Sequence, residues 1–147
     1  MKVLIDADAC PVTDIAVCLC KKYRTECLLL CDTAHTLYRD GAATLVFDKG
    51  ADSVDIALAN RVCTGDIVIT QDYGLAAMCL GKNATVLHQD GWAYTQDNID
   101  GLLFQRYASK KYRAAGGRTK GPAKRKCSQD LAFSESLEKL LQQSVQG

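Results

Sequence analysis

The sequence lacks several features that mark common protein classes. No apolar run approaches the ~18 residues that a membrane-spanning helix needs. The first apolar stretch is interrupted at Asp6, so it does not resemble a secretory signal. The chain also contains no G-x-G-x-x-G, no Walker loop and no G-x-S-x-G elbow, which argues against dinucleotide-binding, P-loop and serine-hydrolase chemistry. We therefore expect a cytoplasmic protein that does not bind a membrane.

Cysteine is plentiful, with eight residues, but the spacings of metal sites are missing. No two cysteines are spaced C-x-x-C, and His35 and His88 stand far from paired thiols, so a structural zinc site lacks its usual pattern. In a reducing compartment we expect the thiols to stay free and to pack as small apolar residues. Because the two histidines are isolated, each is expected to be a satisfied surface or strand-end residue rather than a catalytic base.

Acidic residues are absent from residues 101–129, which carry nine Lys or Arg. Residues 1–100 carry eight Lys or Arg and fourteen Asp or Glu, a balance of −6, and residues 130–147 have a balance of −2. The net charge of +1 therefore hides an acidic body and a basic segment. The basic segment is either a solvated helix face with a disordered loop or a surface that binds nucleic-acid phosphates. The candidate phosphate-binding residues are Lys110, Lys111, Arg113, Arg118, Lys120, Lys124, Arg125 and Lys126.

The first part of the chain alternates short apolar runs with helical patterns. Strands are expected at Val3–Ile5, Cys27–Cys31, Thr44–Phe47, Ile67–Thr70 and Thr85–His88, and helices at Val12–Lys22, Ser53–Val62 and Leu75–Leu80, with a turn or helix at Ala34–Tyr38. Continuous hydrophobicity in the strands indicates burial on both faces, as in a parallel sheet. We predict one domain over residues 1–147, an α/β fold built as a three-layer α/β/α sandwich with a mainly parallel sheet of about five strands.

A C-terminal helical extension is expected after the sheet. Thr95 is the predicted N-cap of a helix that runs to about Ala115. The later part of this helix belongs to a basic helix and loop at 101–129. The apolar stripe of this helix is traced by Ile99, Leu102, Leu103, Arg106 and Tyr107. Ser128 is the predicted cap of a last helix, at 128–145, with an apolar face.

Acidic residues recur at one predicted edge of the sheet. They follow the first and fourth strands and stand at the start of the helix after the third strand. These positions lie at the carboxyl edge of the sheet, where ligands bind in α/β folds. Carboxylates crowded together repel one another unless a cation neutralises them, and all-oxygen ligands suit Mg²⁺ or Mn²⁺. Singly, each acid could instead cap a helix or open a turn. Jointly they predict a metal site formed by Asp6, Asp8, Asp52, Asp55 and Asp72. Asp66 precedes its strand, so we expect it at the opposite edge as a turn residue.

Three segments resemble the YaiI/YqxD family of uncharacterised bacterial proteins, over essentially the whole chain. They are Asp6-Ala7-Asp8-Ala9-Cys10-Pro11, the run GDIVITQDYGLA from Gly65 to Ala76, and Arg118-Thr119-Lys120-Gly121-Pro122. That family is grouped with PIN-like domains, which include Mg²⁺/Mn²⁺-dependent ribonucleases. The resemblance implies a PIN-like parallel sandwich in which Asp6, Asp55 and Asp72 are the catalytic metal ligands, supported by Asp8 and Asp52. It does not imply a substrate, since PIN-like relatives also include inactive or regulatory proteins.

Three functional hypotheses follow from these residues. The first is a Mg²⁺- or Mn²⁺-dependent nuclease acting on RNA, with Tyr107 and Tyr112 stacking on bases. The second is a nucleic-acid-binding module without catalysis, based on the same basic segment. The third is a phosphatase of the haloacid dehalogenase type, in which Asp6 and Asp8 are nucleophile and acid and Thr70 and Lys82 fit later motifs. Cys10 and Pro11 depart from the pattern that this third hypothesis requires.

Overall fold

The computed structural model describes the chain except for residues 9, 51–52, 119–123 and 147. The described residues form an α/β fold with a six-stranded, mostly parallel sheet and five helices. The strands are β1 (Lys2–Asp6), β2 (Glu26–Asp32), β3 (Ala43–Phe47), β4 (Ile67–Ile69), β5 (Thr85–Leu87) and β6 (Ala93–Tyr94). The helices are α1 (Thr13–Lys22), α2 (Ser53–Arg61), α3 (Tyr73–Leu80), α4 (Gln96–Ala114) and α5 (Cys127–Gln146).

The strand order places β1 at the centre of the sheet. The order is β3-β2-β1-β4-β5-β6, and β1 pairs in parallel with both β2 and β4, so that Val3 faces Cys27 on one side and Ile67 on the other. The chain builds outward from β1 to β3 and then returns to β4 on the other side. Between β1 and β4 the sheet therefore has a topological switch point, where α/β folds form a crevice at the carboxyl ends of the strands.

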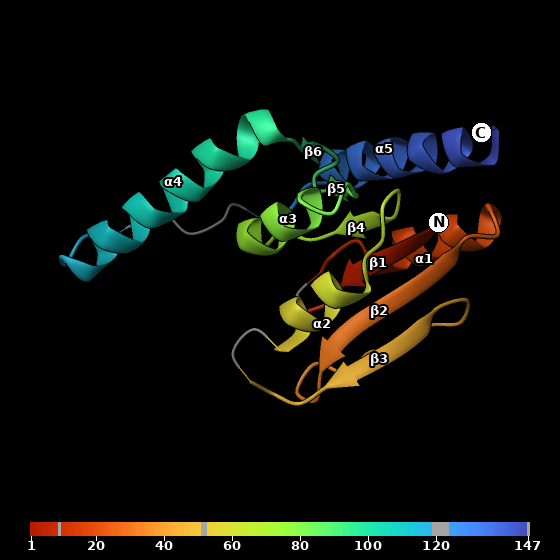
Figure 1. Ribbon diagram of the computed structural model, residues 1–147, viewed down its shortest axis with the longest axis horizontal. Coiled ribbons are helices and arrows are strands. Elements are labelled where there is room, and N and C mark those ends of the chain that lie inside the picture. The colour runs from red at the N-terminus through yellow and green to blue at the C-terminus, as the bar shows by residue number, and fades with distance from the viewer. Residues whose placement is uncertain (9, 51–52, 119–123, 147) are drawn as a thin grey trace.

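Helices cover both faces of the sheet, as the sequence predicts (Figure 1). Ile5 points to one face and packs in a cluster with α1 and with Phe133 of α5. Leu4, its neighbour in β1, points to the other face and packs in a second cluster with Leu58 of α2 and Leu75 of α3. Successive side chains of a strand point to opposite faces, so a fully apolar run needs a hydrophobic layer on each side. The three-layer prediction is therefore confirmed.

Only the first part of α4 packs against the body. Ile99 is the one buried residue that the described part of α4 contains, and α3 is the helix that α4 packs against. Arg106 and Tyr107 end the predicted apolar stripe but lie exposed, as does Phe104. Figure 1 shows α4 extending away from the sheet. We call residues 104–114 the arm. Along the described chain, no helix combines the length and apolarity needed to cross a membrane.

Several local predictions need correction. The structure adds β6, which pairs antiparallel with β5 and whose two residues are too short to give a periodic signal. Of the turn or helix predicted at Ala34–Tyr38, the structure has the turn, because Asp32 Oδ1 accepts the backbone N–H groups of Ala34 and His35. Helix α5 begins at Cys127, so Ser128 lies inside it rather than capping it. Thr95 caps α4 as predicted, since its Oγ1 accepts from the backbone N–H of Asn98 at 3.2 Å.

The cysteines are all free, and only half of them are core residues. Buried thiols occupy positions on β2, α1 and α3, where they behave as small apolar groups. The prediction that cysteines serve as core residues is therefore wrong for the exposed ones, namely Cys18, Cys63 and Cys127.

Candidate functional site

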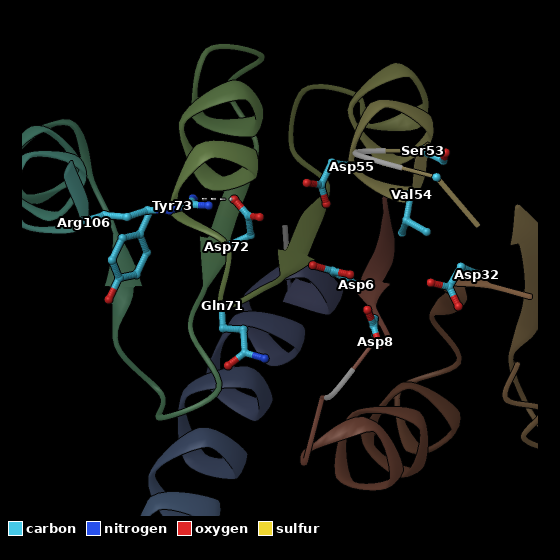
Figure 2. Close-up of a pocket in the computed structure, with 11 residues that line it drawn as sticks. Asp6, Asp8, Asp32, Ser53, Val54, Asp55, Gln71, Asp72, Tyr73 and Arg106 are labelled. Carbon is cyan, nitrogen blue, oxygen red and sulfur yellow. Dashed lines mark ion pairs between the residues drawn. The ribbon is translucent and has the colours of Figure 1, made fainter. Parts of the chain in front are cut away.

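A pocket of about 410 Å³ opens at the switch point between β1 and β4 (Figure 2). Its wall is formed by the carboxyl ends of β1, β2 and β4 and by the first turns of α2 and α3. The lining residues are Asp6, Asp8, Asp32, Gly50, Ser53, Val54, Asp55, Gln71, Asp72, Tyr73 and Arg106. Five of these eleven residues are aspartates, so the pocket is strongly acidic.

Three of the predicted ligands, Asp6, Asp55 and Asp72, form an inner group that comes from three separate elements. Asp6 is the last residue of β1, and Asp55 lies in the first turn of α2, where the helix dipole favours a carboxylate. Asp72 is the N-cap of α3, and its Oδ1 accepts from the backbone N–H of Leu75 at 3.0 Å. Figure 2 shows their carboxylates turned toward the same space. The structure thus brings together residues that are far apart in the sequence.

The surroundings of Asp6 in the pocket raise its pKa. Burial is the main cause that raises the pKa of Asp6, and the charges of Asp55, Asp72 and Asp8 raise it further. A hydrogen bond from Thr70 Oγ1 to Asp6 Oδ2, at 3.0 Å, opposes them. The resulting pKa is about 7. At pH 7 Asp6 is therefore only partly ionised, and a divalent cation would bind its ionised form.

An outer group lies beside the inner one and consists of Asp8, Asp32 and His35. His35 Nδ1 lies 2.9 Å from Asp32 Oδ1 and 3.3 Å from Asp8 Oδ1, and one ligand atom from each of the three residues lies within 4.8 Å of the others. The bond to Asp32, followed by the charge of Asp8, raises the pKa of His35, while the bond from His35 lowers the pKa of Asp32. The geometry makes this group able to bind a metal ion.

Sequence reasoning missed two members of the outer group. Asp32 ends β2, next to β1, so the rule that selected Asp8 and Asp72 at the carboxyl edge also selects Asp32. His35 had no comparable signal. It is exposed and hydrogen-bonded, as expected, but the turn closed by Asp32 carries it beside Asp8 and Asp32, which line the acidic pocket. Asp52, another predicted ligand, lies outside the described residues.

Arg106 is a further lining residue that the sequence did not identify as functional. It belongs to α4, and its Nη1 lies 3.5 Å from Asp72 Oδ1 (Figure 2). In the sequence Arg106 falls in the predicted apolar stripe, so the pattern did not indicate that its charge reaches the pocket. A long Arg side chain can lie along an apolar face and still place its charge in a polar site.

The predicted phosphate-binding residues occupy different environments. Lys110, Lys111 and Arg113 lie exposed on the arm, together with Tyr107 and Tyr112, which are 58% and 56% exposed. Lys111 Nζ lies 5.5 Å from the centre of the Tyr107 ring. Three others lie exposed outside the helices, namely Arg118, Lys124 and Lys126. Lys120 lies outside the described residues. The arm therefore combines positive charge with exposed aromatic rings.

Arg125 differs from its basic neighbours because its guanidinium is half-buried between three acceptors. It donates at 2.7 Å to Asp90 Oδ1, to Asp130 Oδ1 and to the carbonyl oxygen of Gln89. These bonds join the turn after β5 to the start of α5. The side chain thus makes a structural connection between these two elements.

Asp66 lies at the opposite edge of the sheet, as predicted, but it is more than a turn residue. Only 3% of it is exposed, and it accepts from Lys2 Nζ at 2.7 Å and from the backbone N–H of Cys63 at 2.8 Å. It therefore ties the start of β1 to the turn before β4, far from the acidic pocket.

Comparison with known proteins finds relatives along nearly the whole chain. A family model described as "Uncharacterized BCR, YaiI/YqxD family" matches residues 4–143, a span that includes all the residues that line the pocket. A "UPF0178 protein" from Exiguobacterium sibiricum is 48% identical over 141 residues, covering 96% of this chain and 96% of that relative. One from Ruminiclostridium cellulolyticum is 52% identical over 138 residues, covering 93% and 90%. No solved structure matches the chain, so the PIN-like relationship stays a prediction.

Proposed function

We propose that this chain, which belongs to the YaiI/YqxD family, is a nuclease that depends on Mg²⁺ or Mn²⁺ and acts on RNA. The observation that carries the proposal is the convergence of Asp6, Asp55 and Asp72 at the switch point. Three carboxylates that line one pocket, with Asp6 half-buried among them, repel one another unless a cation neutralises them. Their persistence in one pocket is best explained by a divalent metal that they hold.

The donor set fits a hard divalent cation. The inner group offers only oxygen atoms, which suit Mg²⁺ or Mn²⁺ better than zinc. Asp6, Asp55 and Asp72 would hold the ion, and Asp8 would support them from the outer group. When bound, such an ion supplies an activated water and stabilises the charge that develops on a phosphate under attack.

The chain itself supplies substrate binding and orientation. Thr70 fixes the Asp6 carboxylate through a hydrogen bond, so that it faces the pocket. The arm is the outer part of α4, and its residue Arg106 reaches the pocket. Its lysines would pair with backbone phosphates, and Tyr107 and Tyr112 would stack on exposed bases, at ~1–3 kcal/mol per base. Bases are accessible for stacking in single-stranded RNA, which is therefore the favoured form of substrate.

A cleavage assay with a pool of labelled RNAs and Mn²⁺ tests the proposal. We expect cleavage that EDTA stops and that Asp6→Asn reduces by at least ~100-fold, as expected for removal of a group that stabilises the transition state. Asp100→Asn is the matched control, because it removes an exposed carboxylate from α4 that does not line the pocket. Absence of cleavage of any RNA or DNA, or full activity in Asp6→Asn, contradicts the proposal.

A second candidate is a nucleic-acid-binding module without catalysis. It is favoured by one observation: the exposed charges and aromatic rings of the arm lie along α4, and only Arg106 reaches the acidic pocket. This candidate predicts salt-dependent RNA binding that survives both EDTA and Asp72→Asn. Loss of binding in EDTA counts against it.

The phosphatase hypothesis finds less support in the geometry. Its required lysine, Lys82, bonds to the backbone carbonyl of Ala59 in the last part of α2. Lys82 is not among the described residues that line the pocket. Thr70 does contact Asp6, but without a lysine beside these two residues the pattern is incomplete.

A further inference from the structure

Arg106 is the one cationic side chain among the described residues that line the acidic pocket. Its Nη1 lies 3.5 Å from Asp72 Oδ1, and its side chain is 57% exposed. Exposed ion pairs of this length are weak and are screened by salt, so a competing charge can break them. The guanidinium is therefore held at the mouth of the pocket without being locked there.

Asp72 does not need Arg106 to keep its orientation. The same oxygen, Oδ1, accepts from the backbone N–H of Leu75 at 3.0 Å, which fixes the carboxylate as the N-cap of α3. A structural role for the ion pair is therefore unnecessary. A divalent cation in the inner group would carry twice the charge of Arg106 and would compete with it for Asp72.

The local backbone leaves space for the pair. A Cβ atom added at Gly74 would lie 3.3 Å from Asp72 Oδ1 and 3.9 Å from Arg106 Nη1. A glycine at this position thus avoids a tight contact with the Asp72 carboxylate, while the contact with Arg106 would be an ordinary one. Arg106 also stands where the arm meets the pocket, because Tyr107, Lys110 and Lys111 follow it directly along α4. An RNA strand bound along the arm would therefore contact Arg106 at the point where it enters the pocket.

We propose that Arg106 binds a phosphodiester group of the nucleic acid at the entrance of the pocket, and that Asp72 holds its guanidinium there until a divalent cation occupies the inner group. The planar guanidinium donates two parallel hydrogen bonds to a phosphate, which a lysine cannot do. This inference rests on the proposed function in taking nucleic acid as the ligand and a divalent cation in the inner group. Metal binding thereby releases the residue that binds the substrate.

Mn²⁺ affinity gives the first test, by calorimetric titration of the metal-free chain. Arg106→Ala removes the competing cation, so we expect Mn²⁺ to bind about 2–5-fold more tightly, a range that follows from the strength of an exposed ion pair. Arg113→Ala is the matched control. It removes the same charge seven residues further along α4, about 10 Å away along the helix axis, and should leave Mn²⁺ affinity unchanged. Equal Mn²⁺ affinities in wild type and Arg106→Ala contradict the competition between metal and arginine.

RNA binding gives the second test, with fluorescein-labelled polyuridylate followed by anisotropy in Ca²⁺, so that binding rather than cleavage is measured. Arg106→Ala should weaken binding about 10-fold in Ca²⁺ and much less in EDTA, where Asp72 still holds the guanidinium. Arg113→Ala should weaken it equally in both conditions. Loss of one phosphate contact in Arg106→Ala should lower the slope of the salt dependence of binding by about one unit. Arg106→Lys keeps the charge, so it should restore this slope but only part of the affinity.

The outcomes separate this inference from the proposed nuclease activity. If the wild-type chain cleaves RNA and Arg106→Ala cleaves and binds equally well, the role of Arg106 is wrong and the nuclease stands. If the metal-dependent effect of Arg106 on binding is found without any cleavage, the nuclease is wrong and the inference stands. Failure of the wild-type chain to bind polyuridylate in Ca²⁺ overturns the inference, whereas the cleavage assay alone decides the nuclease. Circular dichroism of each variant checks that the fold is kept.

Discussion

Thr70 joins Asp6 and Asp72, the two acids at the ends of β1 and β4. Its Oγ1 donates to Asp6 Oδ2 at 3.0 Å and accepts from the backbone N–H of Asp72 at 3.0 Å. Only 2% of Thr70 is exposed, and its carbonyl oxygen accepts from Tyr94 Oη at 3.2 Å. Because the backbone N–H of Asp72 occupies one side of the hydroxyl, its proton is directed at Asp6. One buried hydroxyl therefore sets the position of the central acid in the pocket.

Thr70→Val should weaken metal binding through Asp6. The variant keeps the shape of the side chain but removes the donor that stabilises the charged carboxylate, so the pKa of Asp6 rises above its present value of about 7. Mn²⁺ affinity at pH 7 should fall, and it should recover as the pH is raised. We also expect a loss of about 1–3 kcal/mol in the free energy of unfolding, because the backbone N–H of Asp72 loses its acceptor. Thr70→Ser keeps the hydroxyl and should bind Mn²⁺ as the wild type does.

Mn²⁺ affinity should depend on pH around neutrality. A metal ligand must be ionised, and Asp6 has a pKa of about 7, so affinity should rise through pH 7 and level off above about pH 8. Calorimetry in buffers of different ionisation enthalpy should detect up to one proton released per bound ion at pH 6.5. Asp6→Asn should bind Mn²⁺ weakly and show no proton release in this range. A flat profile between pH 6 and 8 contradicts the role of Asp6.

The metal-free chain should lose stability as the pH rises from about 4 to 7. The pKa of Asp6 is about 7 in the folded state and about 3.9 in an unfolded chain, so the folded state binds this proton more tightly over that window. Deprotonation then disfavours folding. Urea unfolding in EDTA should show this decline in the wild type and a smaller one in Asp6→Asn, which should be the more stable protein at pH 8. A wild type that is equally stable at pH 5 and 8 argues against the raised pKa, provided that Asp6→Asn behaves the same way.

Asp66 should show the opposite dependence. Burial opposes its ionisation, but the bonds from Lys2 and from the backbone N–H of Cys63 outweigh burial and lower the pKa of Asp66. Its contribution to stability is therefore present above about pH 4, the unfolded value, and is lost as the pH falls through the lower folded value. Asp66→Asn should reduce the free energy of unfolding by about 1–3 kcal/mol at pH 7 and leave Mn²⁺ affinity unchanged. Changed Mn²⁺ affinity would mean that the two edges of the sheet are coupled.

Arg125→Ala should destabilise the fold more than its exposed neighbours do. The guanidinium donates to Asp90, to Asp130 and to the carbonyl oxygen of Gln89, and hydrogen bonds to charged groups contribute about 1.5–3 kcal/mol each. We expect a lower melting temperature, measured by differential scanning calorimetry. Lys124→Ala removes an adjacent exposed charge and should leave the melting temperature within about 1 °C, since surface substitutions have small effects. Equal melting temperatures of the two variants would contradict the structural role of Arg125.

Much of the fold could be predicted because its signals are local. The apolar runs of β1, β2 and β4 have no polar alternation, and such runs fold as strands buried on both faces. Thr95 caps α4 through its own side chain and that of Asn98 three residues later, a pattern visible in the sequence. By contrast, β6 depends on pairing with β5 rather than on its own two residues, so no periodicity identified it.

The sequence by itself determined that acids would follow parallel strands, and it thereby selected Asp6, Asp8, Asp55 and Asp72, because strand ends can be read from local patterns. The tertiary structure decided which other side chains join them. Strand order brings Asp32 and His35 beside Asp8, and the direction of α4 brings Arg106 to Asp72 while Arg125 turns to Asp90. These contacts join residues whose separation along the chain carries no periodic signal. They depend on how whole elements pack, which local preference does not specify.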